Sequence, residues 1–550
     1  MCLNYYCKIP ILYEMESIVF LYAVTDSQYV FEASFDGKSA AERSLTWAKP
    51  FASPHDVFVA CLSSTEQKVQ AAASNAGVTV KTLTESAWNT QSLLEAVIKS
   101  CSDSKADRVL LAPLSAPFLD AALTQKVTDA HERYCAEYTC ADGYPKALAP
   151  ELLASSTAVI LRDIIKDKPC ASAPVDADCI MNALKTDINS FEVESVLSPR
   201  DWRYLRLDFT TETKRTYLAC CNLFQAAKKE QSDFSAQNLS VLAAKTASVQ
   251  CTVPAYYAIQ LTTDSRTTVT YNAFAAGYKK QSGTYPTQGI EHKTTVLDLA
   301  SLKTIAAQIS ELSDDATVCL GCGSEPLLHP DFTACVKTLL DNPKLRILIE
   351  TDGTLVTPEL ASQIASLDAD GRITWIVCLD AASEATYLSI HVPLSEAGGR
   401  AYFTAAVSSV GILSPLFKGR VYPQMVRMNA NETELEQFYR YWHDAASPSE
   451  GNVIIQKYDS CAGFLSDEKP ADLSPLVRTP CWHVKRDMII RADGSVPLCQ
   501  ALIAESSELN VCKCSVEEAW KQIVTQVPCQ VSGEYPSLCR KCDEYYTFNF

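Results

Sequence analysis

The chain has 550 residues, enough for three or four domains, and 47% of them are hydrophobic, as in an ordinary globular protein. Its formal net charge of −17 is not offset by a basic block, which argues against nucleic acid or an anionic membrane as a partner. No run of 18 apolar residues indicates a transmembrane helix. No signal peptide is recognised, so the 23 cysteines are expected to be reduced in the cytoplasm. Residues 1–14 are interpreted as an extension ahead of the first buried strand.

Residues 15–225 alternate short apolar strands with amphipathic helices, which is typical of an α/β layer fold. Strands are predicted at Ile18–Ala23, Asp56–Ala60, Val78–Thr82 and Arg108–Ala112, and helices at Ala40–Lys49, Thr65–Ala76, Gln91–Ser100 and Ala122–Tyr134. The segments DGKSAAERSLTWA and DRVLLAPLSAPFLD resemble segments of sugar cytidylyltransferases, which implies a nucleotidyltransferase-like domain of the GT-A type. Nucleotidyl transfer needs a carboxylate for Mg²⁺, but Ser115 stands at the position of that acid. We therefore predict the fold without the catalysis.

A second α/β series occupies residues 251–470, after a polar helical stretch at residues 226–250 that is interpreted as a linker. Its strands are predicted at Tyr257–Thr263, Thr317–Leu320, Leu345–Glu350, Thr374–Leu379, Tyr422–Met428 and Asn452–Lys457, and its clearest helix at Glu432–Trp442. Six βα units imply an open, partial TIM-type barrel with its chemistry at the carboxyl ends of the strands.

Three segments of this series, LGCGSEPLLHPDF, LIETDGTL and VCLDAASEATY, resemble the radical AdoMet superfamily. In that resemblance Gly321, Gly323 and Glu325 receive the aminoacyl part of AdoMet, so they are the candidate cofactor-binding residues and AdoMet is a candidate cofactor. Without the resemblance, Gly323 and Pro326 simply shape a βα loop.

The cluster motif of that superfamily is missing from the barrel. A C-x3-C-x2-C run should follow the first strand, because three thiolates hold three irons while AdoMet occupies the fourth. Laying IQLTTDSRTTVTYNAFAA over this segment places Ser265, Val269 and Asn272 at the three cysteine positions. None of these side chains is a normal cluster ligand, so the barrel is predicted not to cleave AdoMet.

The tail, residues 471–550, has a distinctive cysteine pattern. Cys539 and Cys542 form a C-x2-C knuckle, and Cys481 and Cys499 bracket a predicted hairpin. The hairpin is predicted to consist of strands Met488–Arg491 and Val496–Cys499 joined by an Asp493-Gly494 turn. It would bring four thiolates to one metal site, which suits either Zn²⁺ or an iron–sulfur cluster.

The pattern C-x12-G-x4-C followed by a distant C-x2-C resembles the SPASM domain in its short, single-cluster (Twitch) form. The whole chain resembles the spiro-SPASM proteins, a spirochaete family with this tail on a radical-AdoMet-like domain that lacks its cluster motif. The resemblance implies one [4Fe–4S] cluster on Cys481, Cys499, Cys539 and Cys542. The leading hypothesis is an iron–sulfur protein without radical chemistry, acting in binding or electron transfer with an unknown protein or peptide partner. The alternatives are an AdoMet-binding or peptide-modifying enzyme with an unusual site, for which no catalytic residue is identified, and a zinc-stabilised structural protein.

Overall fold

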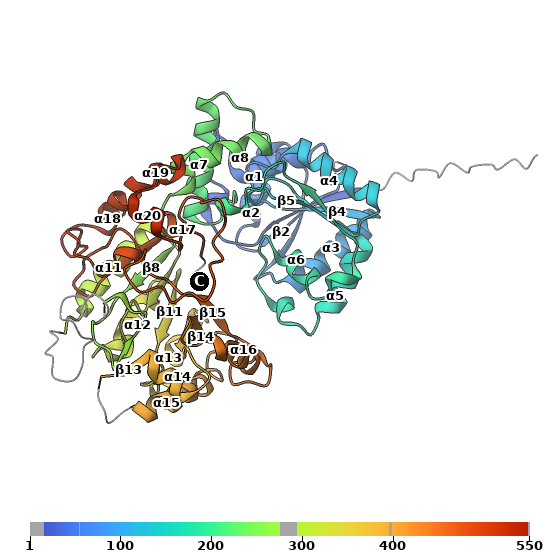
Figure 1. The fold of residues 1–550 in the computed structure, drawn as a ribbon. Helices are drawn as coiled ribbons and strands as arrows, with labels where there is room; N and C mark the ends of the chain where they lie inside the picture. The colour runs from blue at the N-terminus through green and yellow to red at the C-terminus, as the bar shows by residue number, and fades with distance from the viewer. Residues whose placement is uncertain (1–15, 54, 275–293, 395–398, 548–550) are drawn as a thin grey trace, which may run out of the picture. The chain divides into compact units, whose positions relative to one another are not determined.

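The computed structural model describes residues 16–53, 55–274, 294–394 and 399–547. The chain forms two compact units, Met1–Gln250 and Cys251–Phe550, and the extension proposed for residues 1–14 lies outside the described residues (Figure 1). In the described part of the chain, no helix has the length and apolar character needed to cross a membrane. The predicted α/β class is confirmed, since both units combine a mostly or wholly parallel sheet with helices.

The first unit is built on a seven-stranded sheet in the order β3-β2-β1-β4-β6-β5-β7. Its strands are β1 Ser17–Ala23, β2 Val57–Leu62, β3 Lys81–Glu85, β4 Arg108–Pro113, β5 Tyr138–Asp142, β6 Glu151–Ala154 and β7 Val193–Leu197. Its helices are α1 Ala40–Ala48, α2 Glu66–Ala76, α3 Thr90–Ser104, α4 Ala121–Tyr134, α5 Ser155–Ile165, α6 Cys179–Leu184, α7 Lys214–Lys229, α8 Ala236–Lys245 and α9 Ala247–Gln250. Strands β1 to β4 are parallel, and β6 runs antiparallel to β4.

Strand β1 is buried on both faces of this sheet. Val19 and Leu21 join one buried cluster, while Phe20 and Tyr22 join another on the opposite face. Burial on both faces gives a continuous apolar run, which is why the strand could be predicted. Strand β3 begins three residues later than predicted, because the left-handed C-cap at Gly77, with φ of 62°, first closes helix α2.

Residues 226–250, interpreted from the sequence as a linker, are mostly helical and contain the end of α7 with all of α8 and α9. Leu239, Leu242 and Val249 are buried in the same cluster as Phe224. These residues belong to the first compact unit.

The second unit contains a seven-stranded parallel sheet in the order β15-β14-β12-β11-β10-β8-β16. Its strands are β8 Tyr256–Ile259, β10 Ala316–Leu320, β11 Leu345–Thr351, β12 Ile373–Cys378, β14 Val421–Arg427, β15 Ile454–Lys457 and β16 Asp487–Ile490. A separate antiparallel ribbon pairs β9 Thr267–Val269 with β13 His391–Pro393. The helices are α11 Leu299–Ser313, α12 Phe332–Leu340, α13 Pro358–Leu367, α14 Glu384–Ile390, α15 Gly399–Leu413, α16 Leu435–His443, α17 Trp482–Arg486, α18 Val516–Ile523, α19 Val527–Ser532 and α20 Ser537–Lys541.

The two faces of this second sheet have different surroundings. On one face, Tyr257 and Trp375 are fully buried in a cluster that includes residues of helices α11 to α16. On the other face, Tyr256 and Ile376 line a cavity. Because side chains alternate along a strand, each strand contributes both to the helix-covered core and to the cavity wall.

The hairpin predicted in the tail is not formed as a two-stranded unit. Its turn exists, with Arg491 N donating to Ser495 O at 2.9 Å, but its first strand is β16, which pairs in parallel with β8. The predicted return strand, Val496–Cys499, is not a strand, and Val496 N instead donates to Leu509 O at 2.9 Å. An edge strand offers unpaired backbone groups, and β8 satisfies those of β16 more completely than a short hairpin would. The tail therefore contributes the seventh strand of the barrel sheet.

Candidate metal centre and barrel cavity

Two of the four predicted ligand cysteines occupy the N-cap positions of short helical segments. Cys481 precedes α17, and Cys499 precedes a turn of 3-10 helix at Gln500–Leu502. The first N–H groups of a helix have no partner within it, so they are available to a sulfur atom at the cap. The donors facing the two sulfurs are the backbone N–H groups of His483 and Val484 for Cys481, and of Ala501 and Leu502 for Cys499.

The knuckle cysteines also accept hydrogen bonds at sulfur. Gln530 Nε2 donates to Cys539 Sγ at 3.2 Å, and Glu544 N donates to Cys542 Sγ at 3.4 Å. Gln530 is fully buried, and its Oε1 accepts from Cys481 N at 3.4 Å. One buried amide thus links two of the candidate ligands. Hydrogen bonds of this kind stabilise thiolates, which are the metal-binding form of cysteine.

The four tail cysteines lie within electrostatic range of other members of the set. Burial raises the pKa of Cys481 and of Cys499 to about 11, and that of Cys542 to about 12. The charges of neighbouring thiolates contribute to these raised pKa values: Cys499 and Cys539 act on Cys481, and Cys481 acts on Cys542. Thiols in such surroundings lose their protons when a cation binds, so a metal would stabilise the group as a whole.

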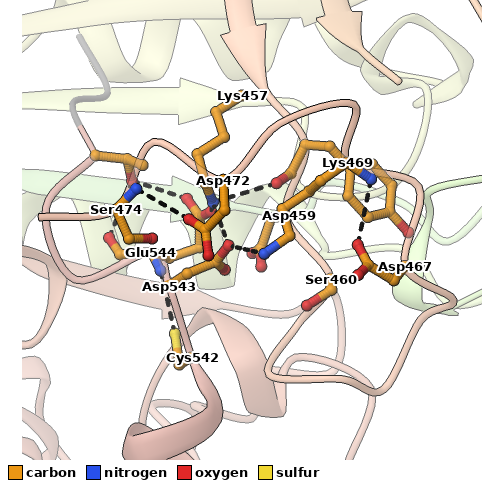
Figure 2. Close-up of polar contacts among 12 residues, drawn as sticks. Lys457, Asp459, Ser460, Asp467, Lys469, Asp472, Ser474, Cys542, Asp543 and Glu544 are labelled. Carbon is orange, nitrogen blue, oxygen red and sulfur yellow. Dashed lines mark hydrogen bonds and ion pairs between the residues drawn. The ribbon is translucent and has the colours of Figure 1, made fainter. Parts of the chain in front are cut away.

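A network of ion pairs holds the knuckle against strand β15. Lys457 at the end of β15 pairs with Glu544, and its Nζ lies 3.1 Å from Asp543 Oδ2. Lys469 Nζ lies 2.5 Å from the same Asp543 oxygen (Figure 2). The acidic oxygens of Asp459, Asp543 and Glu544 lie within 4.8 Å of one another. Because two lysines neutralise most of this negative charge, the group acts as a structural network.

A cavity of about 620 Å³ lies on the inner face of the barrel sheet, and Cys499 of the tail forms part of its wall. The wall also contains Cys319 and Cys378, whose thiols lie 3.9 and 3.6 Å from the two carboxylate oxygens of Glu350. Burial raises the pKa of Glu350. These residues were not predicted as a site; the C-x2-C spacing of Cys319 and Cys322, both in the cavity wall, could have indicated part of it.

The two glycines predicted to bind AdoMet are in close contact with the chain itself. A Cβ on Gly321 would lie 2.5 Å from Glu350 Cβ, so a side chain there would collide with strand β11. Gly323 has a φ of 69°, and its missing Cβ would lie 2.6 Å from the ring of Phe274. Contacts within the chain therefore explain why glycine stands at both positions, and Phe274 covers Gly323.

Glu325, the third predicted cofactor residue, is 3% exposed and already bonded by the protein. Its Oε1 accepts from Leu327 N and from Thr351 Oγ1 at 3.1 and 2.9 Å, and its Oε2 accepts from Asp352 N at 2.8 Å. Burial raises the pKa of this carboxyl well above its usual range, and the charge of Asp352 adds to the effect. The observed contacts fix the loop, and AdoMet binding there stays a prediction.

The three positions that replace the barrel cysteines lie on or beside the β9–β13 ribbon and line the cavity. Val269 is paired with His391 across the ribbon. Ser265 Oγ donates to Thr267 O at 2.7 Å, and Asn272 Nδ2 donates to Gly323 O at 2.7 Å. The segment is therefore fixed by its own hydrogen bonds.

In the first unit, a carboxyl group stands beside Ser115. Ser115 Oγ donates to Glu212 Oε1 at 2.9 Å across 97 residues of sequence. Burial, followed by the charge of Asp208, raises the pKa of Glu212 to about 7. Sequence reasoning missed Glu212 because no motif surrounds it. That the first unit does not transfer nucleotides remains a prediction.

These features define a two-unit α/β protein with a cysteine-lined site in its second unit. No family model matches the chain. An uncharacterized protein from Treponema pallidum (strain Nichols) is 35% identical over 378 residues, which are 68% of this chain and 98% of that protein. The chain belongs to the same family as this Treponema pallidum protein.

Three solved structures show weaker similarity. Streptococcus suis SuiB bound to precursor peptide SuiA is 12% identical, with 72% of this chain and 84% of that chain covered and a TM-score of 0.40. BtrN in complex with AdoMet and 2-DOIA is 15% identical, with coverages of 53% and 94% and a TM-score of 0.33. A cytidylyltransferase from Leptospira borgpetersenii serovar Hardjo-bovis (strain JB197) is 14% identical, with coverages of 42% and 92% and a TM-score of 0.33. Similarity at this level does not carry a function from those proteins to this chain.

Proposed function

We propose that this chain binds one [4Fe–4S] cluster through Cys481, Cys499, Cys539 and Cys542, and that it acts in binding or electron transfer with a protein or peptide partner. The observation that supports the proposal is that four thiols from three segments are each faced by N–H donors, which stabilise thiolates. When bound, such a cluster supplies one-electron redox chemistry. Membership of the spiro-SPASM proteins and a cytoplasmic location are part of the same proposal.

The described tail sulfurs are not gathered as tightly as a single zinc ion requires. A tetrahedral Zn²⁺ site with bonds of about 2.3 Å holds its ligand atoms about 3.8 Å apart. Within the described ranges, the three ligand atoms gathered within 4.8 Å of one another belong to the acidic network, and the four thiols do not form so tight a group. A four-iron cluster is wider than a single ion, so its thiolates stand further apart.

Two features support the absence of radical AdoMet chemistry. Ser265, Val269 and Asn272 offer no thiolate, and their segment is fixed by the β9–β13 ribbon and by the bond from Asn272 to Gly323. The tail supplies four cysteines, which leaves no iron free to bind the amino and carboxylate groups of AdoMet.

Cysteine substitutions test the ligand set. We expect Cys481→Ala and Cys539→Ala to retain less than about half of the iron bound by the wild type after anaerobic reconstitution, since a cluster missing one thiolate is labile. Cys512→Ala and Cys529→Ala are matched controls, because both cysteines are exposed tail residues outside the set. Equal iron retention in ligand and control variants would show that the ligand set is wrong.

A further inference from the structure

Three buried polar atoms in the cavity wall have no hydrogen-bond partner among the residues that the structure describes. They are Thr267 Oγ1, Asp352 Oδ2 and His391 Nδ1, and their residues are 3%, 8% and 0% exposed. Folded proteins satisfy nearly all of their buried polar atoms, because leaving one unpaired costs its full hydration. Three such atoms on the wall of one cavity therefore point to a ligand that would satisfy them.

His391 is held in one orientation by its neighbours. Its Nε2 lies 2.8 Å from Asp380 Oδ2, which also accepts from Tyr271 OH at 2.7 Å. The Tyr387 ring stacks on the imidazole, with centroids 4.4 Å apart and an angle of 3° between the planes. Because Nε2 faces the carboxylate, Nδ1 is the ring nitrogen left for a ligand, and it accepts a hydrogen bond when it carries no proton.

Asp352 contributes a second acceptor to the same part of the wall. Its Oδ1 accepts from Thr354 N and Thr354 Oγ1 at 2.8 and 2.7 Å, which leaves Oδ2 for the cavity. Tyr387 lies near both groups: its ring stacks on His391, and its pKa is raised by burial and then by the charge of Asp352. Asp352 and His391 both line the same cavity.

Thr267, on strand β9 of the ribbon, is the third residue in the cavity wall with a polar atom unpaired among the described residues. Val269 is paired with His391 across the ribbon, and Thr267 lies two residues from Val269. Residues two apart in a strand share a face, so Thr267 and Val269 both face the side of the ribbon that lines the cavity. The hydroxyl can accept a hydrogen bond as well as donate one.

We propose that this region binds the ammonium group of a primary amine that has no neighbouring carboxylate. An ammonium group has three N–H donors and no acceptor, which matches a carboxylate oxygen, an imidazole nitrogen and a hydroxyl oxygen. The one lysine that the structure places in the wall, Lys457, is already paired with Glu544. The carboxylate of Asp352 attracts a cation and repels a ligand carboxylate.

The remaining wall suits the carbon skeleton of such an amine. Phe274, Ile376 and Val426 contribute apolar surface, and a volume of about 620 Å³ falls in the range of small-molecule sites. A metal ion is disfavoured, because in the described part of the chain the acidic, histidine and cysteine atoms within 4.8 Å of one another are those of Asp459, Asp543 and Glu544. The three polar atoms of the site are distinct from the four tail cysteines, of which Cys499 lines the same cavity.

Calorimetric titration of the full-length protein tests the proposal with hexylamine and phenethylamine as probes. Hexanol has the same chain without the charge, and norleucine adds a carboxylate beside the amine. We expect at least one of the two amines to bind at least about tenfold more tightly than hexanol and norleucine. Failure of both amines to bind, or equal affinity for hexanol, would overturn the proposal.

Two substitutions identify the acceptors. Asp352→Asn keeps Oδ1 for Thr354 and replaces Oδ2 by an amide NH₂ donor, so amine affinity should fall at least about tenfold. Thr267→Val removes the hydroxyl at constant shape and should weaken binding by about threefold or more. Asp370→Asn is the control, since its side chain is 74% exposed. Amine affinity that is unchanged in Thr267→Val and in a folded Asp352→Asn contradicts the assignment; if Asp352→Asn does not fold, Thr267→Val alone decides.

Discussion

Trp520 joins the tail to the helical layer of the barrel, and its replacement tests whether tail and barrel form one unit. The side chain is 3% exposed in the cluster that also contains Ile305 and Ile309 of α11. Its Nε1 donates to Thr252 O at 2.8 Å, just ahead of β8. With β16 paired to β8, the tail and the barrel share both a sheet and a core.

Trp520→Ala should therefore destabilise the whole second unit. Truncating a buried aromatic side chain costs about 3–5 kcal/mol, and losing the indole hydrogen bond costs about 1 kcal/mol more. We expect the free energy of unfolding of the second unit to fall by about 4–6 kcal/mol. Leu476→Ala is the control, because Leu476 is fully exposed and its loss should change stability by less than about 0.5 kcal/mol.

Urea unfolding followed by hydrogen exchange measures the loss of stability in the tail and in the barrel separately. The expected result is that amides of β8 and β16 lose protection at the same urea concentration, and that this concentration is lower in Trp520→Ala. A loss of less than about 1 kcal/mol would refute the reasoning. So would a tail that unfolds alone while β10 and β11 keep their wild-type midpoint, since that result would make the tail a separately appended module.

The remaining predictions concern both units. Burial raises the pKa of Glu212 to about 7, so between its unfolded pKa and pH 7 the folded state binds more protons than the unfolded state. The free energy of unfolding therefore falls as pH rises towards 7. Glu212→Gln should remove this pH dependence and raise the free energy of unfolding above pH 7 by up to about 3 kcal/mol. Melting curves from about pH 5 to 8 measure it, and parallel profiles for wild type and variant would contradict it. Lys457→Met should speed the release of iron to a chelator several-fold relative to the exposed control Lys344→Met, because it leaves Asp543 and Glu544 without one of their cations; equal release rates would show that the network does not support the knuckle. Reduced protein incubated with AdoMet should form no 5′-deoxyadenosine, and product made over multiple turnovers would reveal a ligand set other than the tail cysteines.

Hydrophobic patterns within short stretches of sequence predicted some of the strands. Strands β1 and β4 contain continuous apolar runs, because parallel strands in the middle of a sheet are buried on both faces. Strand β16 was predicted within one residue, but its pairing was wrong, because its partner β8 lies more than 200 residues earlier and the Asp493-Gly494 turn favours a hairpin at short range.

The residues of the candidate site also fall into two groups, those that a local motif predicts and those that only the folded structure brings together. The knuckle spacing of Cys539 and Cys542 is local and could be predicted, whereas Gln530, which bonds Cys539 and Cys481, has no signature of its own. The pairing of His391 with Asp380 depends on the register of β13 against β9, and this register cannot be predicted from one sequence. Side chains that meet only through tertiary contacts lie beyond motif reasoning.

The most direct test of the central claim is the metal and sulfide content of the wild-type protein purified without oxygen. The four-cysteine site predicts a brown protein with close to four irons and four acid-labile sulfides per chain, as expected of one [4Fe–4S] cluster. Stoichiometric zinc without sulfide would contradict the claim and leave the tail as a zinc-stabilised structural element.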